Sequence, residues 1–134
     1  MSFDLLGSDI VTVLNEFNIT SPTDIQNRSI QEILDRKNVL LMAPTGSGKT
    51  EAAILPLLKL VKDNKSPGIK VLYIAPLRAL NRDLLLRLEK IGEAMGITIK
   101  ARHGDTTQSE RRRQSLKPPD ILITTPETLQ ALFT

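Results

Sequence analysis

The chain has 134 residues, of which 40% are hydrophobic and 25% charged, as in one ordinary globular domain rather than a disordered segment. It has no cysteine and one histidine, which excludes disulfides, thiol chemistry and a zinc centre. The net charge of +3 is uneven: residues 1–68 carry 7 basic against 8 acidic side chains, and residues 69–134 carry 11 against 7. The basic half is therefore where an anionic polymer could bind, although charge alone favours a solvated face.

Nothing in the sequence indicates a membrane protein. No apolar run approaches the roughly 20 residues that a bilayer requires. The N-terminal segment contains Asp4 and no early Lys or Arg, unlike the charged start of a signal peptide. We therefore expect a cytoplasmic protein with no membrane partner.

Helices and strands are expected to alternate along the chain. Two helices are predicted first, one capped by Ser8 and extending through Phe17, the other starting at Ser21 and extending to about Arg36. Unbroken apolar runs then predict four buried strands, at residues 39–43, 71–75, 97–101 and 121–124. Helical patterns at residues 49–62, 80–95 and 109–117 lie between them.

This alternation predicts an α/β fold. Right-handed crossovers between the strands would give a three-layer arrangement, with a mainly parallel sheet and helices on both faces. Ligands are expected at the carboxyl ends of the strands. Residues 63–68 are expected to form a loop, because the segment is too short to separate two domains.

Residues 43–50 form the strongest motif, Ala-Pro-Thr-Gly-Ser-Gly-Lys-Thr, between a predicted strand and a predicted helix. Gly46 and Gly48 allow the backbone N–H groups to curl around a phosphate. The start of the helix would stabilise its charge, Lys49 would reach the outer phosphates, and the Thr50 hydroxyl is suited to bind Mg²⁺. A glycine-rich turn that binds nothing is the disfavoured alternative.

With alanine as its first residue, this loop resembles the phosphate loop of superfamily 2 helicases. The resemblance covers nearly the whole chain, which would be the N-terminal part of a first RecA-like domain. It implies that ATP is bound by the loop residues Thr45, Gly46, Ser47, Gly48, Lys49 and Thr50. In the same family an upstream motif, here Ser21–Gln26, places a glutamine on the adenine. Gln26 occupies that position, and an amide can both donate to and accept from a base. Ile19, Phe17 and Phe3 are the candidates to pack on the adenine.

Three further segments resemble motifs that hold the nucleic-acid backbone, and each follows a predicted strand. They are Pro76 to Leu80, with Arg78 as the phosphate ligand; Gly104 and Asp105; and Thr125, Pro126 and Glu127. Each alone could be a plain turn, but their order matches the family. The amino-acid sequences of these motifs most resemble those of the large helicase-related group. This implies ATP-driven translocation on a single strand, with DNA rather than RNA as the substrate expected by family.

The remaining polar residues have ordinary alternatives. Arg111, Arg112 and Arg113 could attract nucleic acid, but a solvated helix face is the favoured interpretation. His103 is expected to make a polar contact rather than act as an acid or base.

The resemblance also implies parts that residues 1–134 do not supply, namely the acidic motif that holds magnesium and a second RecA-like domain. We therefore expect an incomplete ATP-binding domain that binds nucleotide weakly, hydrolyses it negligibly and associates with itself through an exposed sheet edge. The alternatives are a free-standing nucleotide-binding module, which lacks an identifiable hydrolytic acid, and a small-molecule kinase, which would leave Gln26 unexplained.

Overall fold

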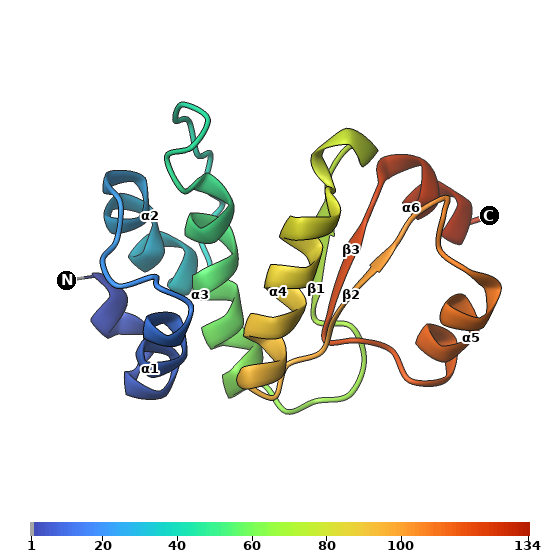
Figure 1. Cartoon of the computed structure of the whole chain (residues 1–134), viewed down its shortest axis with the longest axis horizontal. Helices are drawn as coiled ribbons and strands as arrows, with labels where there is room; N and C mark the ends of the chain where they lie inside the picture. The colour runs from blue at the N-terminus through green and yellow to red at the C-terminus, as the bar shows by residue number, and fades with distance from the viewer. Residues whose placement is uncertain (1) are drawn as a thin grey trace. The chain divides into compact units, whose positions relative to one another are not determined.

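The computed structural model describes residues 2–134, which divide into two compact units, residues 2–64 and residues 65–134. The first unit is helical and the second contains a parallel sheet (Figure 1). The boundary between the units falls within residues 63–68, which form no helix or strand after Asp63. No helix in the described part of the chain has the length and apolar character needed to cross a bilayer.

The first unit contains a 3₁₀ helix, η1 (Ser2–Leu6), and three α-helices: α1 (Ser8–Glu16), α2 (Asp24–Leu34) and α3 (Lys49–Asp63). They pack around apolar side chains that are at most 1% exposed, namely Leu6, Ile10, Leu14, Ile30, Ile54, Leu55 and Leu58. Each such side chain stabilises the fold by about 1.5–3 kcal/mol relative to remaining exposed. Aliphatic packing thus forms the core of this unit.

Both predicted helix starts in this unit need correction. Gly7, not Ser8, is the N-cap of α1, and no side chain caps that helix. The N-cap of α2 is Thr23, not Ser21, because Thr23 and Gln26 form a capping box in which each side chain bonds the other residue's backbone N–H. The start of α2 is therefore set by a reciprocal pair of hydrogen bonds.

The predicted strand at residues 39–43 is wrong. These residues pair with no strand in the described part of the chain, and Leu40 and Met42 are 83% and 80% exposed. A strand requires a neighbour that shares its backbone hydrogen bonds, and the other regular elements of this unit are helices. An apolar run therefore leads into the glycine-rich loop without forming a strand.

The second unit contains three strands, β1 (Val71–Ile74), β2 (Ile99–Arg102) and β3 (Ile121–Thr124). It also contains η2 (Leu77–Ala79), α4 (Arg82–Ala94), α5 (Gln108–Leu116) and α6 (Pro126–Leu132). The strands are parallel in the order β1-β3-β2, with Val71 and Ile99 both opposite Ile121. All four residues of β3 are buried, as expected for a central strand.

The strand order places helices on both faces of the sheet, as the sequence predicts. The crossover through α4 runs from β1 past β3 to β2, and the crossover through α5 returns from β2 to β3. Two right-handed crossovers in opposite directions must lie on opposite faces. Figure 1 shows α4 and α5 on the two sides of the sheet. On the α4 side the packing is close, since a Cβ on Gly92 of α4 would lie 2.8 Å from Cδ1 of Ile99 in β2.

A charged pair joins the amino ends of the strands. Lys70 Nζ lies 2.7 Å from Asp120 Oδ1, and the Thr98 N–H donates to Asp120 Oδ2 at 3.0 Å. Burial raises the pKa of Asp120, but the bond from Lys70, the Thr98 N–H and the Lys70 charge together hold it below its ordinary value. The carboxylate therefore links the segments before β1, β2 and β3.

Candidate functional site

The glycine-rich loop of the first unit has the backbone conformation that a phosphate cradle needs. Gly46 and Gly48 have φ values of +83° and +85°, in the left-handed region that glycine tolerates. Gly48 is the N-cap of α3, so the helix begins at Lys49 as predicted. A Cβ on Gly46 would meet nothing within 4 Å, which leaves open space beside the loop.

Gln26 connects α2 to this loop. Its Oε1 accepts the Thr23 N–H at 2.9 Å, and its Nε2 donates to the Gly48 carbonyl at 3.2 Å. Gln26 is only 4% exposed, and a Cβ on Gly48 would lie 2.6 Å from its Nε2. The sequence predicts an adenine contact for Gln26. The structure adds a contact to the phosphate loop, and contact with adenine stays a prediction.

The other predicted nucleotide ligands differ in exposure. Thr45 and Lys49 are exposed, whereas Ser47 and Thr50 are half-buried. The Ser47 hydroxyl and N–H both donate to the Pro44 carbonyl, at 2.6 and 3.2 Å, so Ser47 stabilises the loop from within. Of the candidates to pack on adenine, Phe3 is 3% exposed and belongs to the core, while Phe17 and Ile19 are half-buried.

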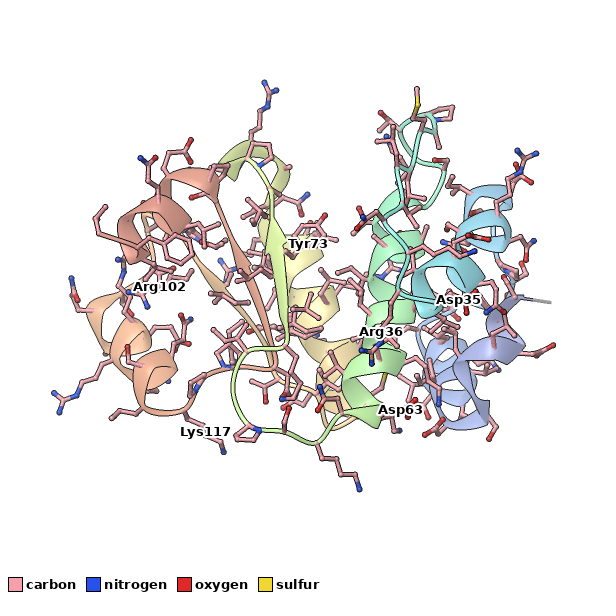
Figure 2. All side chains as sticks on the ribbon, turned by 180° about the vertical axis from the view of Figure 1, so that it is seen from behind. Asp35, Arg36, Asp63, Tyr73, Arg102 and Lys117 are labelled. Atoms are coloured by element: carbon pink, nitrogen blue, oxygen red, sulfur yellow. The ribbon has the colours of Figure 1, made fainter. Side chains whose placement is uncertain are left out.

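In the second unit, the three predicted backbone-binding segments follow the carboxyl ends of the three strands. Pro76 and Arg78 come after β1, Gly104 and Asp105 after β2, and Thr125 after β3. Because parallel strands end at the same edge of a sheet, these segments share that edge. Figure 2 labels Arg102, the last residue of β2, whose carbonyl accepts the Thr124 hydroxyl at 2.7 Å. The sheet thus pairs residues 50 positions apart in sequence, such as Ile74 and Thr124.

Residues 103–106 form a tight turn. The His103 N–H donates to Thr106 Oγ1 at 2.9 Å, and the Thr106 N–H donates back to the His103 carbonyl at 3.0 Å. The Asp105 N–H donates to His103 Nδ1 at 3.2 Å, which is the polar contact expected for His103. Gly104 and Asp105 are exposed at the tip of this turn.

Thr125 has a local structural role. Its hydroxyl accepts the Thr128 N–H at 3.2 Å and donates to the Thr128 hydroxyl at 2.9 Å, so Thr125 caps α6. Thr125 is 3% exposed, whereas Pro126 and Glu127, in the first turn of α6, are exposed. In this predicted segment, Pro126 and Glu127 are therefore the residues best able to contact a ligand.

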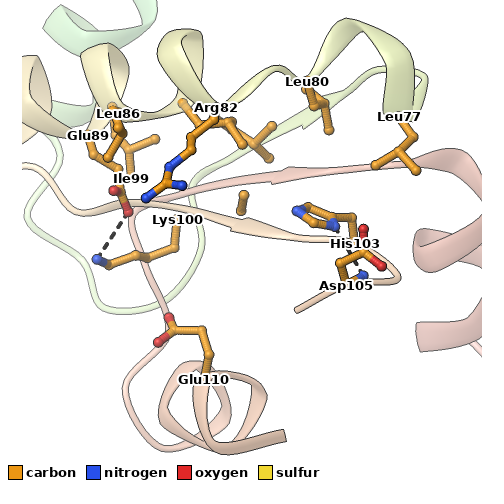
Figure 3. Close-up of a pocket in the computed structure, with 13 residues that line it drawn as sticks. Leu77, Leu80, Arg82, Leu86, Glu89, Ile99, Lys100, His103, Asp105 and Glu110 are labelled. Carbon is orange, nitrogen blue, oxygen red and sulfur yellow. Dashed lines mark hydrogen bonds and ion pairs between the residues drawn. The ribbon is translucent and has the colours of Figure 1, made fainter. Parts of the chain in front are cut away.

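A cavity of about 530 Å³ adjoins the turn on the side of β2 that faces α4 (Figure 3). Its apolar lining includes Leu77, Leu86 and Ile99, and its charged lining includes Glu89 and Lys100, which pair at 3.1 Å. His103 and Asp105 lie at one end (Figure 3). No set of three His, Asp or Glu side chains able to hold a metal ion occurs within residues 2–134.

Arg111 makes contacts that the sequence does not predict, because a solvated helix face is the interpretation favoured for all three arginines. Its Nε donates to the Thr106 carbonyl at 3.1 Å and its Nη2 to the His103 carbonyl at 3.0 Å. Arg112 is exposed, and exposed Arg113 pairs with half-buried Glu110 at 3.5 Å. Three adjacent arginines look alike in sequence, and only their positions on the folded helix distinguish them.

Comparison with known proteins gives consistent matches. The family model described as DEAD/DEAH box helicase matches residues 23–134. The chain is 43% identical over 124 residues to the ATP-dependent helicase Lhr-Core of Methanocaldococcus jannaschii, an alignment that covers 80% of this chain and 15% of that protein. It is 39% identical over 129 residues to the Lhr helicase/probable uracil glycosylase of Mycolicibacterium smegmatis, covering 85% of this chain and 9% of that protein.

A solved structure of Mycobacterium smegmatis helicase Lhr, bound to single-stranded DNA and AMP-PNP, matches with a TM-score of 0.73 and 36% identity. The match covers 92% of this chain and 18% of the Lhr chain. The chain thus spans only a small part of the relatives it matches. The sheet, the phosphate loop and the family model agree, and the chain belongs to the DEAD/DEAH box helicase family.

Proposed function

We propose that this chain is the ATP-binding part of an ATP-dependent helicase or translocase that acts on single-stranded DNA. The observation that carries the proposal is the loop at residues 43–50, with two left-handed glycines immediately before the 15-residue helix α3. The similar Lhr helicase was solved with AMP-PNP and single-stranded DNA, which supports the choice of ligands.

The loop residues fit a nucleoside triphosphate. The first N–H groups of α3 have no acceptor within the helix and no side-chain cap, and a Cβ on nearby Gly46 would meet nothing within 4 Å. Exposed Lys49 could reach outer phosphate oxygens, and the Thr50 hydroxyl would be the side-chain oxygen offered to a Mg²⁺ ion. Bound Mg²⁺ would neutralise charge on the phosphates during transfer.

Phosphoryl transfer needs several positioned groups besides a lysine and a hydroxyl. Lys49 and Thr50 are the catalytic candidates that these residues offer. We therefore expect the chain by itself to bind ATP weakly and to hydrolyse it negligibly. A turnover rate for the isolated chain that disappears in Lys49→Ala would contradict this expectation.

The second unit would hold the single strand along the carboxyl edge of its sheet. Exposed Arg78 offers a charged donor for a phosphate, and the turn at Gly104 lets backbone groups approach closely. Exposed Glu127 carries the wrong charge for a phosphate and would face a sugar or a base. These contacts do not distinguish DNA from RNA through a 2′-hydroxyl, so the preference for DNA rests on the similar Lhr helicase.

Fluorescence anisotropy with a labelled adenine nucleotide and, separately, a labelled single strand tests the proposal. We expect Lys49→Ala to abolish nucleotide binding and leave strand binding unchanged. We expect Arg78→Ala to weaken strand binding several-fold and leave nucleotide binding unchanged. The control for the loss of one positive charge is Arg112→Ala, because Arg112 is exposed. Arg87 is less suitable because it takes part in another interaction. Absence of binding to both ligands would overturn the proposal.

We also propose that copies of the chain associate through β1. Within residues 2–134 this strand pairs only with β3, and its Leu72 and Ile74 are 46% and 48% exposed. A free strand edge with exposed apolar side chains favours pairing with another chain. Light scattering should show mass rising with concentration, and Leu72→Lys should prevent the rise, whereas Leu116→Lys on α5 should not. A single monomer mass at all concentrations would contradict the proposal.

A further inference from the structure

The guanidinium group of Arg111 spans the turn that carries Gly104 and Asp105. Nε and Nη2 donate to the carbonyls of Thr106 and His103, at 3.1 and 3.0 Å. These two carbonyls lie at the two ends of the turn. A planar guanidinium can hold two acceptors in one arrangement, which the single ammonium group of a lysine cannot reproduce.

The bonds from Arg111 complete a network that begins within the turn. His103 and Thr106 already exchange two hydrogen bonds, at 2.9 and 3.0 Å, and the Asp105 N–H is held by the His103 ring at 3.2 Å. The His103 carbonyl accepts from both the Thr106 N–H and Arg111. Removal of Arg111 would leave the hydrogen bonds within the turn intact but would remove the two bonds from the α5 side chain that join its ends.

We infer that Arg111 is a positioning residue, which holds residues 103–106 in the conformation that contacts the single strand. Two of its nitrogens are occupied by carbonyls and its side chain is half-buried, so it acts through the turn rather than on a phosphate. A mobile loop would have to be ordered when the strand binds, which weakens binding. This inference rests on the proposed contact between the turn and a single strand.

The neighbouring arginine provides a matched control. Arg112 lies on the same helix, has the same charge and is exposed. Arg112→Ala therefore removes one positive charge from α5 without touching the turn. Arg111→Lys does the reverse, because it keeps the charge and loses the two-carbonyl contact.

The test measures strand binding by anisotropy at several salt concentrations for the unsubstituted chain, Arg111→Lys, Arg111→Ala and Arg112→Ala. We expect both Arg111 variants to bind about tenfold more weakly, because ordering of the turn then adds to the cost of binding. Arg112→Ala should change affinity less than about threefold. Amide hydrogen exchange without ligand should become faster at Thr106 in both Arg111 variants and stay unchanged at Ile123 in β3.

A second substitution loosens the same turn from its other side. Thr106→Val removes the acceptor of the His103 N–H while Arg111 remains in place. Thr106→Val should also weaken strand binding without changing the salt dependence. If the Arg111 variants do not fold, this variant still tests whether the conformation of the turn affects strand binding.

Other outcomes would overturn the inference. If Arg111→Lys binds like the unsubstituted chain while Arg111→Ala lowers the salt slope by about 0.7, Arg111 contacts a phosphate directly. Unchanged exchange at Thr106 would show that Arg111 does not hold the turn. If the unsubstituted chain binds no single strand, the proposed function fails instead, and the exchange measurement still reports on the anchoring of the turn.

Discussion

Three structural features coincide at Gly48. Its φ of +85° allows it to end the phosphate loop, its carbonyl accepts both the Ala52 N–H and Gln26 Nε2, and it has no room for a side chain. The positive φ and the lack of space each favour glycine, and the carbonyl bonds join the loop to α2 and α3. The sequence motif predicts Gly48 as a phosphate ligand but does not reveal this packing role.

Gly48→Ala should be more destabilising than Gly46→Ala. Both substitutions place alanine in the left-handed region, at a cost of about 1–2 kcal/mol. At Gly48 the new Cβ would also lie 2.6 Å from Gln26 Nε2, whereas at Gly46 nothing lies within 4 Å. Urea unfolding would measure the two free energies, and equal values for the two variants would contradict the predicted contact.

Among the elements, the segment at residues 39–43 and strand β3 show why similar apolar runs can differ. Ile121–Thr124 has a parallel neighbour on each side and is fully buried. Residues 39–43 have an equally apolar sequence but no partner among the described residues of their unit. Apolar character predicts burial, but a strand forms only where another backbone completes its hydrogen bonds.

Asp120 should make the second unit sensitive to acid. Its pKa is lower in the folded chain than in the unfolded one, so its stabilising effect is complete above the unfolded value, near pH 4. That effect is lost as the pH falls through the lower, folded pKa. Asp120→Asn should lower the free energy of unfolding at pH 7 by about 1–2 kcal/mol and reduce this acid dependence.

Chemical unfolding at pH 7 and at pH 3 would measure both effects. Asp35→Asn is the matched control, because Asp35 is exposed and an asparagine there can still accept the bond from Gln31. If the stability of Asp120→Asn fell with acid as steeply as that of the unsubstituted chain, the proposed role of the Lys70–Asp120 pair would be wrong.

At the scale of the whole molecule, the two units have net charges of opposite sign. Residues 1–64 carry 6 basic and 8 acidic side chains, a net charge of −2, and residues 65–134 carry 12 and 7, a net charge of +5. The positive unit is also the one whose strands end at the predicted backbone-binding segments. Charge and topology therefore agree on where a single strand would bind.

Strand binding should weaken roughly tenfold when salt is raised from 50 to 200 mM, as expected if two or three phosphates are neutralised. Arg78→Ala should lower the slope of log affinity against log salt by about 0.7, the effect of one phosphate on a single strand. Anisotropy titrations at four salt concentrations would provide the slopes. An affinity independent of salt would show that the basic residues of the second unit do not hold the strand.

The sequence by itself determined the family, the alternation of helices and three strands, and the start of α3 at Lys49. These features depend on short-range signals: apolar runs, glycine spacing and the position of a motif between elements. Their physical causes lie within a few residues of each position, so a linear pattern contains them.

Only the tertiary structure decided the rest. It showed Gln26 bonded to Gly48, Thr125 used as a helix cap, residues 39–43 without a strand partner, and Arg111 distinguished from Arg112 and Arg113 by its two carbonyl acceptors. Most of these features depend on which groups meet across a turn, a sheet or a helix pair. A hydrogen bond needs its partner within about 3 Å, and that proximity is set by folding rather than by residue type.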